Sequence, residues 1–200
     1  MSIRLPLLVG LCLALVTGDC RLDASTQHGP SLAVPDGLQA GDLVFREGTE
    51  LISAAVMRVD SGGYSHVGLL IGEPGHWRIV HAVPAERSDR GNEVVIDDLT
   101  FFLAPERTRN AAFYRVDADP ETRRNAVAFA MQQQGVPFRI GSEQGTYCTR
   151  LIDESYLHAG LSLQVRYQYL HIPLLQGEYL LPSALRTSPR LSLIYATGRM

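Results

Sequence analysis

The chain has 200 residues, of which 46% are hydrophobic and 20% charged, and this composition is that of one globular domain with a substantial core. Its formal net charge is −3, and its basic residues are all arginines that form no block along the chain. Such a charge pattern argues against nucleic acid as a partner.

The first 20 residues predict an export signal, which would place the mature protein in the periplasm or at the cell envelope. Arg4 gives a positive start, and residues 5–16 are an apolar run of twelve, too short to span a bilayer comfortably. Cleavage is expected after Gly18. A lipid anchor on Cys20, which would attach the protein to a membrane, is the alternative, although Asp19 lies where a lipidation signal has Gly, Ala or Ser. An uncleaved anchor is a third interpretation.

Residues 21–36 are polar, contain Pro and Gly, and are typical of a linker that leads into a domain over 37–200. Alternation and turn signals predict strands over 43–46, 64–71, 77–83, 92–99, 111–116 and 190–196. Helical spacing and capping residues predict helices over 49–60, 120–134 and 147–159, and a helical turn within 180–188. Helices together with antiparallel strands indicate the α+β class.

Cys148 is the one cysteine deep in this domain, so no disulfide framework is expected. It lies in the first turn of the helix over 147–159, for which Thr146 is the expected cap, and helical spacing places it on the apolar face. The unpaired N–H groups and the dipole of a helix start favour a thiolate, and a thiolate is a nucleophile. The alternative is a small buried hydrophobic residue.

Two histidines lie in neighbouring apolar strands, His66 in "YSHVGLLI" and His81 in "WRIVHAV". If "GEPG" is the loop between these strands, Ile71 pairs with His76, and His66 lies directly opposite His81 on one face. A cysteine nucleophile needs an adjacent base, and the base needs a third group that holds its ring. Cys148, His66 and His81 would supply these three roles.

Zinc is the alternative use of one cysteine and two histidines. The usual ligand spacings are absent, no fourth ligand is evident, and His76, His158 and His171 follow no common pattern. The sequence therefore predicts a site without a metal or cofactor.

Four motifs, in this order, resemble the circularly permuted NlpC/p60 hydrolases, and within them the YiiX/YebB-like group of exported cysteine hydrolases. These motifs are "AGDLVFR", "YSHVGLLIG", a strand that ends in "IVHA", and "YCTRLIDESYLHAGLSL". The resemblance covers about residues 38–185. It implies a papain-like α+β fold, in which a central antiparallel sheet, partly barrel-like, packs against the nucleophile helix.

The resemblance implies that Cys148 is the nucleophile, His66 the base and His81 the third polar residue. Tyr64 or Tyr147 would lend a hydroxyl to the oxyanion site, although tyrosines in such positions are more often packing groups. Relatives commonly have Cys-Ser-Glu at the nucleophile, where this chain has Cys-Thr-Arg. Arg150 would pair with a substrate carboxylate or, more simply, with an acidic neighbour on its helix.

The sequence thus predicts an exported thiol hydrolase that cleaves amides through an acyl-enzyme, with cell-envelope peptides such as those of peptidoglycan as the expected substrates. Two alternatives remain. The acyltransferase-like relatives suggest lipid ester, thioester or N-acyl chemistry, for which the apolar stretches at 100–104 and 169–181 would line a groove. An inactive envelope-binding domain is the other.

Overall fold

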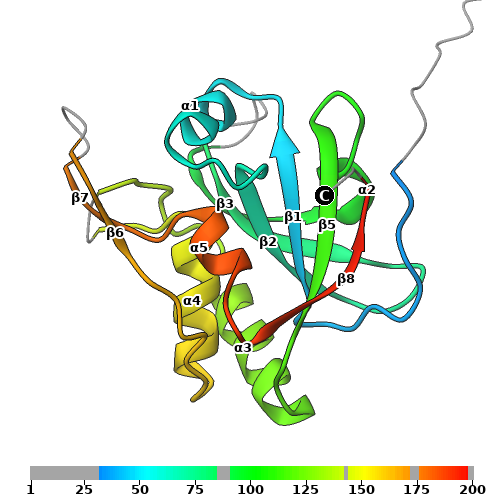
Figure 1. Ribbon diagram of the computed structural model, residues 1–200. Coiled ribbons are helices and arrows are strands. Elements are labelled where there is room, and N and C mark those ends of the chain that lie inside the picture. The colour runs from blue at the N-terminus through cyan, green and yellow to red at the C-terminus, as the bar shows by residue number, and fades with distance from the viewer. Residues whose placement is uncertain (1–31, 85–90, 142–143, 172–175, 198–200) are drawn as a thin grey trace, which may run out of the picture.

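The computed structural model of the protein describes residues 32–84, 91–141, 144–171 and 176–197 (Figure 1). The expected signal at 1–20 and most of the expected linker lie outside the described residues. Among the residues that are described, no helix has the length and the apolar character that crossing a membrane requires.

One antiparallel sheet organises the fold, with the strand order β4-β3-β2-β1-β5-β8. Its strands are β1 (Leu43–Gly48), β2 (His66–Ile71), β3 (Arg78–Val83), β4 (Glu93–Asp98), β5 (Thr108–Val116) and β8 (Leu191–Ala196). The helices are α1 (Leu51–Val59), α2 (Leu99–Phe102), α3 (Pro120–Gln132), α4 (Cys148–His158) and α5 (Pro182–Arg186). A hairpin of β6 (Gln168–Leu170) and β7 (Gly177–Tyr179) stands apart from the sheet. The α+β class is confirmed, whereas the described sheet is open and its expected barrel-like part is not confirmed.

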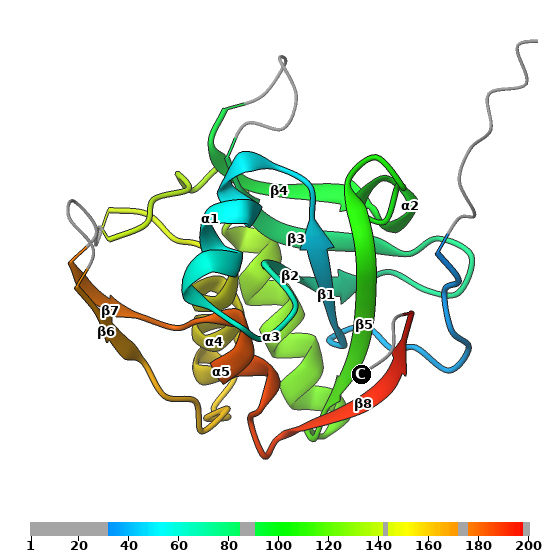
Figure 2. The same ribbon diagram turned by 45° about the horizontal axis from the view of Figure 1, so that its top comes forward.

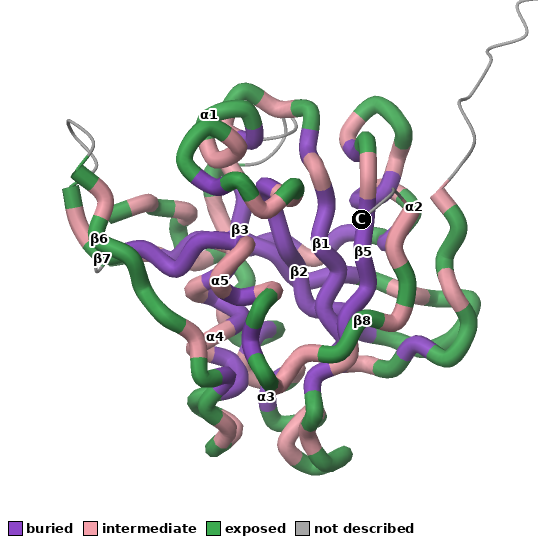
Figure 3. Tube along the Cα trace, viewed as in Figure 1, coloured by how far each residue is buried: buried purple, intermediate pink, exposed green. Residues whose placement is uncertain are grey.

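Both faces of the central strands are buried, which explains why these strands are apolar almost throughout (Figure 3). Val67 and Leu69 face the larger core, where they meet Leu151 and Ile152 of α4 and the inner residues of α3. Figure 2 shows α3 and α4 together against this face. Leu70 faces the opposite side, which α2 covers through Phe102. The sheet therefore separates two layers, and each layer contributes to the site.

Helix α4 presents the apolar face that the sequence predicted. Leu151, Ile152, Ser155 and Tyr156 are fully buried on it, and Cys148 is the first residue of the helix. The expected cap was wrong by one residue, because Tyr147 occupies the N-cap position without a side-chain cap hydrogen bond. An uncapped start leaves backbone N–H groups available beside the cysteine.

The predicted register of β2 against β3 was wrong by two residues. Leu70 pairs with Ile79, and Ile71 pairs with Arg78, because the connecting loop takes in His76 and Trp77 as well as "GEPG". In this loop His76 N–H donates to Glu73 O at 2.9 Å. A shift of two residues preserves the face of every side chain, so His66 and His81 remain on one face as diagonal rather than direct neighbours.

Gly68 provides a test of how tightly the histidine face is packed. A Cβ on Gly68 would lie 2.5 Å from Ile79 Cγ1 and 3.1 Å from the backbone oxygen of Val80. We expect Gly68→Ala to lower the free energy of unfolding by about 1–3 kcal/mol, because the substitution overpacks a closed core. Denaturant unfolding measures this effect, with Gly91→Ala as the control, since a Cβ on Gly91 would meet no atom within 4 Å. Equal stability of the two variants would contradict the packing argument.

Candidate active site

Three buried polar side chains form a chain of hydrogen bonds across β2, β3 and β4. His66 Nε2 lies 2.9 Å from His81 Nδ1, and His81 Nε2 lies 3.0 Å from Asp97 Oδ2. The three residues are only 7%, 1% and 6% exposed. The predicted pairing of the two histidines is thus observed, and Asp97 extends it into a relay of three groups.

Strand alternation places these groups together. His66, His81 and Asp97 point to the α2 side of the sheet, where Phe102 packs against both imidazoles with ring centroids 5.6 and 5.0 Å apart. Asp97 lies opposite Ile79 in the ladder, so it reaches His81 diagonally. Asp97, which lies within the strand predicted over 92–99, was not singled out from the sequence. Asp97 lies two residues after Val95, which pairs with His81, so Asp97 and His81 point to the same face of the sheet. This spacing is the signal that could have identified Asp97.

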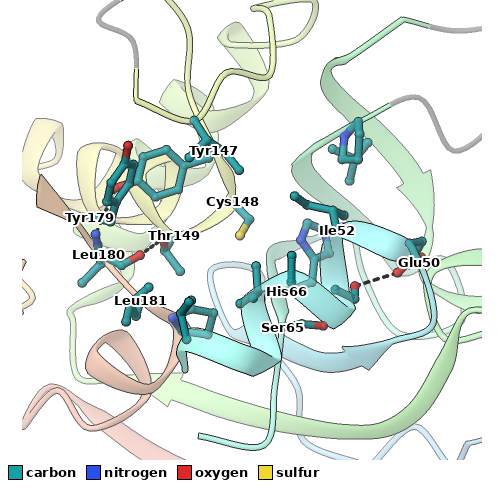
Figure 4. A pocket seen from close by; sticks show the side chains of 18 of the residues that line it. Glu50, Ile52, Ser65, His66, Tyr147, Cys148, Thr149, Tyr179, Leu180 and Leu181 are labelled. Atoms are coloured by element: carbon teal, nitrogen blue, oxygen red, sulfur yellow. Dashed lines mark hydrogen bonds between the residues drawn. The ribbon is translucent and has the colours of Figure 1, made fainter. Parts of the chain in front are cut away.

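Cys148 reaches this relay from the other layer of the fold. Helix α4 packs on the face of the sheet opposite to the relay. His66, however, is the first residue of β2 and so lies at the end of that strand. Backbone N–H groups of Val67, Thr149 and Cys148 lie near enough to the Cys148 sulfur to favour its thiolate form. Figure 4 shows Cys148 and His66 facing each other in one pocket. The structure therefore brings together the nucleophile, base and third group that the sequence predicted.

Burial dominates the ionisation of both reacting groups. Desolvation raises the pKa of the Cys148 thiol to about 11, although the backbone N–H groups and Arg46 act to lower it. Desolvation, with Arg46 and His81 adding to it, holds the pKa of His66 well below 6.5. The lowered thiol pKa expected at a helix start is thus outweighed by burial. Both shifts favour a thiol and a neutral imidazole in the resting site at neutral pH.

The direction in which the chain of hydrogen bonds runs determines which nitrogen of His66 is basic. If His81 donates its Nε2 proton to the Asp97 carboxylate, His81 Nδ1 becomes an acceptor. His66 then donates its Nε2 proton to His81 Nδ1, which leaves His66 Nδ1 as a bare lone pair. A neutral imidazole with a free nitrogen, in the same pocket as a thiol, has the chemistry of a general base.

The pocket that holds Cys148 has a volume of about 280 Å³. Its walls come from α1, the start of α4, the β6–β7 hairpin and the segment that follows it. Most of the lining side chains are apolar or aromatic: Ile52, Ala55, Val56, Val59, Val83, Pro84, Phe138, Ile140, Tyr147, Leu170, Tyr179, Leu180, Leu181 and Pro182. The lining also includes polar and ionisable side chains, among them Glu50, His66 and Cys148.

The two tyrosines predicted for the oxyanion site lie in different places. Tyr147 lines the pocket, and its hydroxyl accepts a hydrogen bond from the Leu180 N–H at 3.0 Å. Tyr64 is absent from the residues that line the pocket, and its ring packs against Phe45 with centroids 6.1 Å apart. The structure therefore brings Tyr147, and not Tyr64, to the site.

Two further expectations concern charge and metals. Arg150 pairs with Glu154 one turn along α4, with Nε 2.7 Å from Oε1, which is the simpler of the two expected arrangements. Across the described parts of the chain, no three His, Cys, Asp or Glu side chains gather in a way that could hold a metal ion.

Comparisons with known proteins identify the family and the fold. A family model described as "Permuted papain-like amidase enzyme, YaeF/YiiX, C92 family" matches residues 37–195. The crystal structure of the metalloprotein yiiX from Escherichia coli O157:H7 superposes with a TM-score of 0.64 at 20% identity, covering 78% of this chain and 96% of that one. At this identity the likeness shows a shared fold. A comparison with curated proteins gave no match.

Proposed function

Because the chain belongs to the family of permuted papain-like amidases and is a cysteine hydrolase, we propose that Cys148, His66, His81 and Asp97 together cleave an amide bond. The observation that carries the proposal is the continuous chain from the Cys148 pocket through His66 and His81 to Asp97. Two buried histidines in series with a carboxylate have a direct use in moving a proton from the thiol.

In the first step His66 Nδ1 takes the thiol proton while Cys148 Sγ bonds to the carbonyl carbon. The C=O electron pair moves to the oxygen, and His81 and Asp97 stabilise the imidazolium that forms. The C–N bond then breaks, His66 returns the proton to the leaving amine, and a thioester remains. Water attacks the thioester with His66 as base, and the acid and the free thiol are released.

The oxyanion would be stabilised at the start of α4. The N–H of Cys148 belongs to the first helical residue and has no partner within the helix, and the helix dipole favours negative charge there. Tyr147 is the second donor that we propose. Its oxygen accepts from Leu180, so its hydroxyl proton remains available to a substrate oxygen.

The lining of the pocket supports an apolar acyl group on the substrate. An N-acyl amide with a hydrocarbon chain would fill walls built from Ile52, Val56 and Tyr179, whereas peptidoglycan peptides carry charged groups that these walls cannot satisfy. We therefore favour the lipid N-acyl alternative, at the envelope location that the signal-like residues 1–20 suggest. A peptidoglycan peptide remains the competing substrate.

A charge placed in the wall of the pocket distinguishes the N-acyl amide from the peptidoglycan peptide as the substrate. We expect Val56→Asp to raise KM for a long-chain N-acyl amide about tenfold or more, because a half-buried carboxylate in the pocket wall opposes the hydrocarbon chain. The control is Ala54→Asp, since Ala54 lies on the same helix but is exposed and outside the pocket lining. Steady-state kinetics on N-acyl amides of increasing length and on peptidoglycan fragments give the answer. Cleavage of the fragments alone, unaffected by Val56→Asp, would point to the envelope peptide.

A further inference from the structure

A fully buried arginine, Arg46, is the neighbour of the proposed base, His66, on the adjacent strand. Arg46 of β1 and His66 of β2 are partners in the antiparallel ladder, and the Arg46 side chain is only 1% exposed. Removing a guanidinium from water costs several kcal/mol unless it is paired and hydrogen-bonded. An apolar residue would fill this strand position without that cost, so the charge calls for an explanation beyond packing.

The guanidinium of Arg46 is fixed from two sides. Its NH1 donates to Phe102 O at 3.2 Å, and its NH2 donates to Glu50 Oε1 at 2.8 Å. Glu50 is itself held by Ser53, whose hydroxyl donates to Oε2 at 2.8 Å. The Arg46 side chain therefore cannot swing out toward solvent without breaking contacts to both α1 and α2.

One aromatic ring joins this cation to the relay. The Arg46 guanidinium carbon lies 4.7 Å from the centroid of the Phe102 ring. The same ring packs against His66 and His81. The cation and both imidazoles thus surround one ring and are almost fully buried, so a fixed positive charge acts more strongly on a second one here than in water.

We infer that Arg46 is a positioning residue that sets the acid limit of the site, because its fixed charge keeps His66 in the neutral form that can accept a proton. This inference rests on the proposed function. The lowering of the His66 pKa agrees with this inference, since Arg46 is the largest cause of the lowering after desolvation. Glu50 weakens the effect of Arg46 on the His66 pKa, because the Glu50 carboxylate neutralises part of the guanidinium charge. Among the described residues, the titratable and charged groups that surround His66 or line its pocket are Arg46 from β1, Glu50 before α1, Arg58 from α1, His81 from β3, Asp97 from β4, Tyr147 before α4 and Cys148 from α4.

The test is the NMR titration of the His66 ring in the full domain, recorded in a Cys148→Ala background. We expect Arg46→Gln to raise the His66 pKa by about one unit or more, and Arg46→Lys, the matched control, to leave it low. Glu50→Gln should lower it further or leave it below the reach of the titration, because the arginine charge is then less compensated. In the active enzyme, the acid limb of kcat/KM should move in the same direction as the pKa.

An unchanged His66 titration in folded Arg46→Gln would overturn the inference. If that variant does not fold, a rise of the His66 pKa in Glu50→Gln would overturn it equally. The titration needs no substrate, so this failure differs from the failure of the proposed function. Absence of amide cleavage, together with the expected pKa shifts, would remove the hydrolase mechanism and leave the electrostatic role of Arg46 standing.

Discussion

Cys148→Ala is expected to lower kcat for the amide substrate by roughly 10⁵–10⁶-fold, because no other group in the pocket can form the thioester. His66→Ala should cost a similar factor, since the pKa of the thiol, raised to about 11, leaves almost no thiolate without a base. The two changes should not add. The double variant is expected to be no slower than either single one, because thiol and imidazole act as a unit.

Mass spectrometry provides a second readout of the same prediction. A slow amide or an activated ester should leave its acyl group on Cys148, identified by the mass of the peptide that contains it, in the wild-type protein but not in Cys148→Ala. His66→Ala should suppress the adduct at neutral pH and recover part of it in alkaline solution, where the thiol ionises. Labelling of the wild-type protein at another residue, with full activity in Cys148→Ala, would show that the nucleophile lies elsewhere.

The parts of the fold that depend on local pattern were predictable from the sequence. The alternation in "YSHVGLLI" identifies a strand, and the spacing of Leu151, Ile152, Ser155 and Tyr156 identifies the buried face of α4. The start of α3 also follows from local chemistry, because Asp119 accepts from the backbone N–H groups of Glu121 and Thr122. These features need only neighbouring residues.

The parts that depend on contacts distant in the sequence were not predictable. The loop between β2 and β3 is longer than its turn signal suggests, so the strand register was wrong by two residues. Asp97 and Arg46 join the site only through the ladders of β4 and β1, and one sequence gives no sign of their partners. The thiol pKa was misjudged for the same reason, since the burial that raises it comes from surrounding elements that meet only in the fold.

The relay of His66, His81 and Asp97 makes its sharpest prediction at Asp97. We expect Asp97→Asn to lower kcat by about 10²–10⁴-fold while the protein stays folded, because the substitution preserves shape and removes the carboxylate. Asp98→Asn is the matched control. It is the neighbouring residue on the same strand, its side chain is 75% exposed, and its 4.0 Å contact with Arg78 is a weak surface pair. Its kcat should stay within about twofold of the wild type.

The reason for this loss is a change of tautomer that passes along the relay. When the amide that replaces the Asp97 carboxylate turns its NH₂ toward His81, it donates to Nε2, so the proton of His81 must move to Nδ1. His81 then donates to His66 Nε2, and the remaining proton of His66 lies on Nδ1, the nitrogen that should face the thiol. The base is lost although every side chain keeps its place. Carbon-13 and nitrogen-15 shifts of the two imidazoles, read in Asp97→Asn and in Asp98→Asn, report the protonated nitrogen directly. An Asp97→Asn enzyme with unchanged imidazole shifts and full activity would mean that catalysis requires only Cys148 and His66.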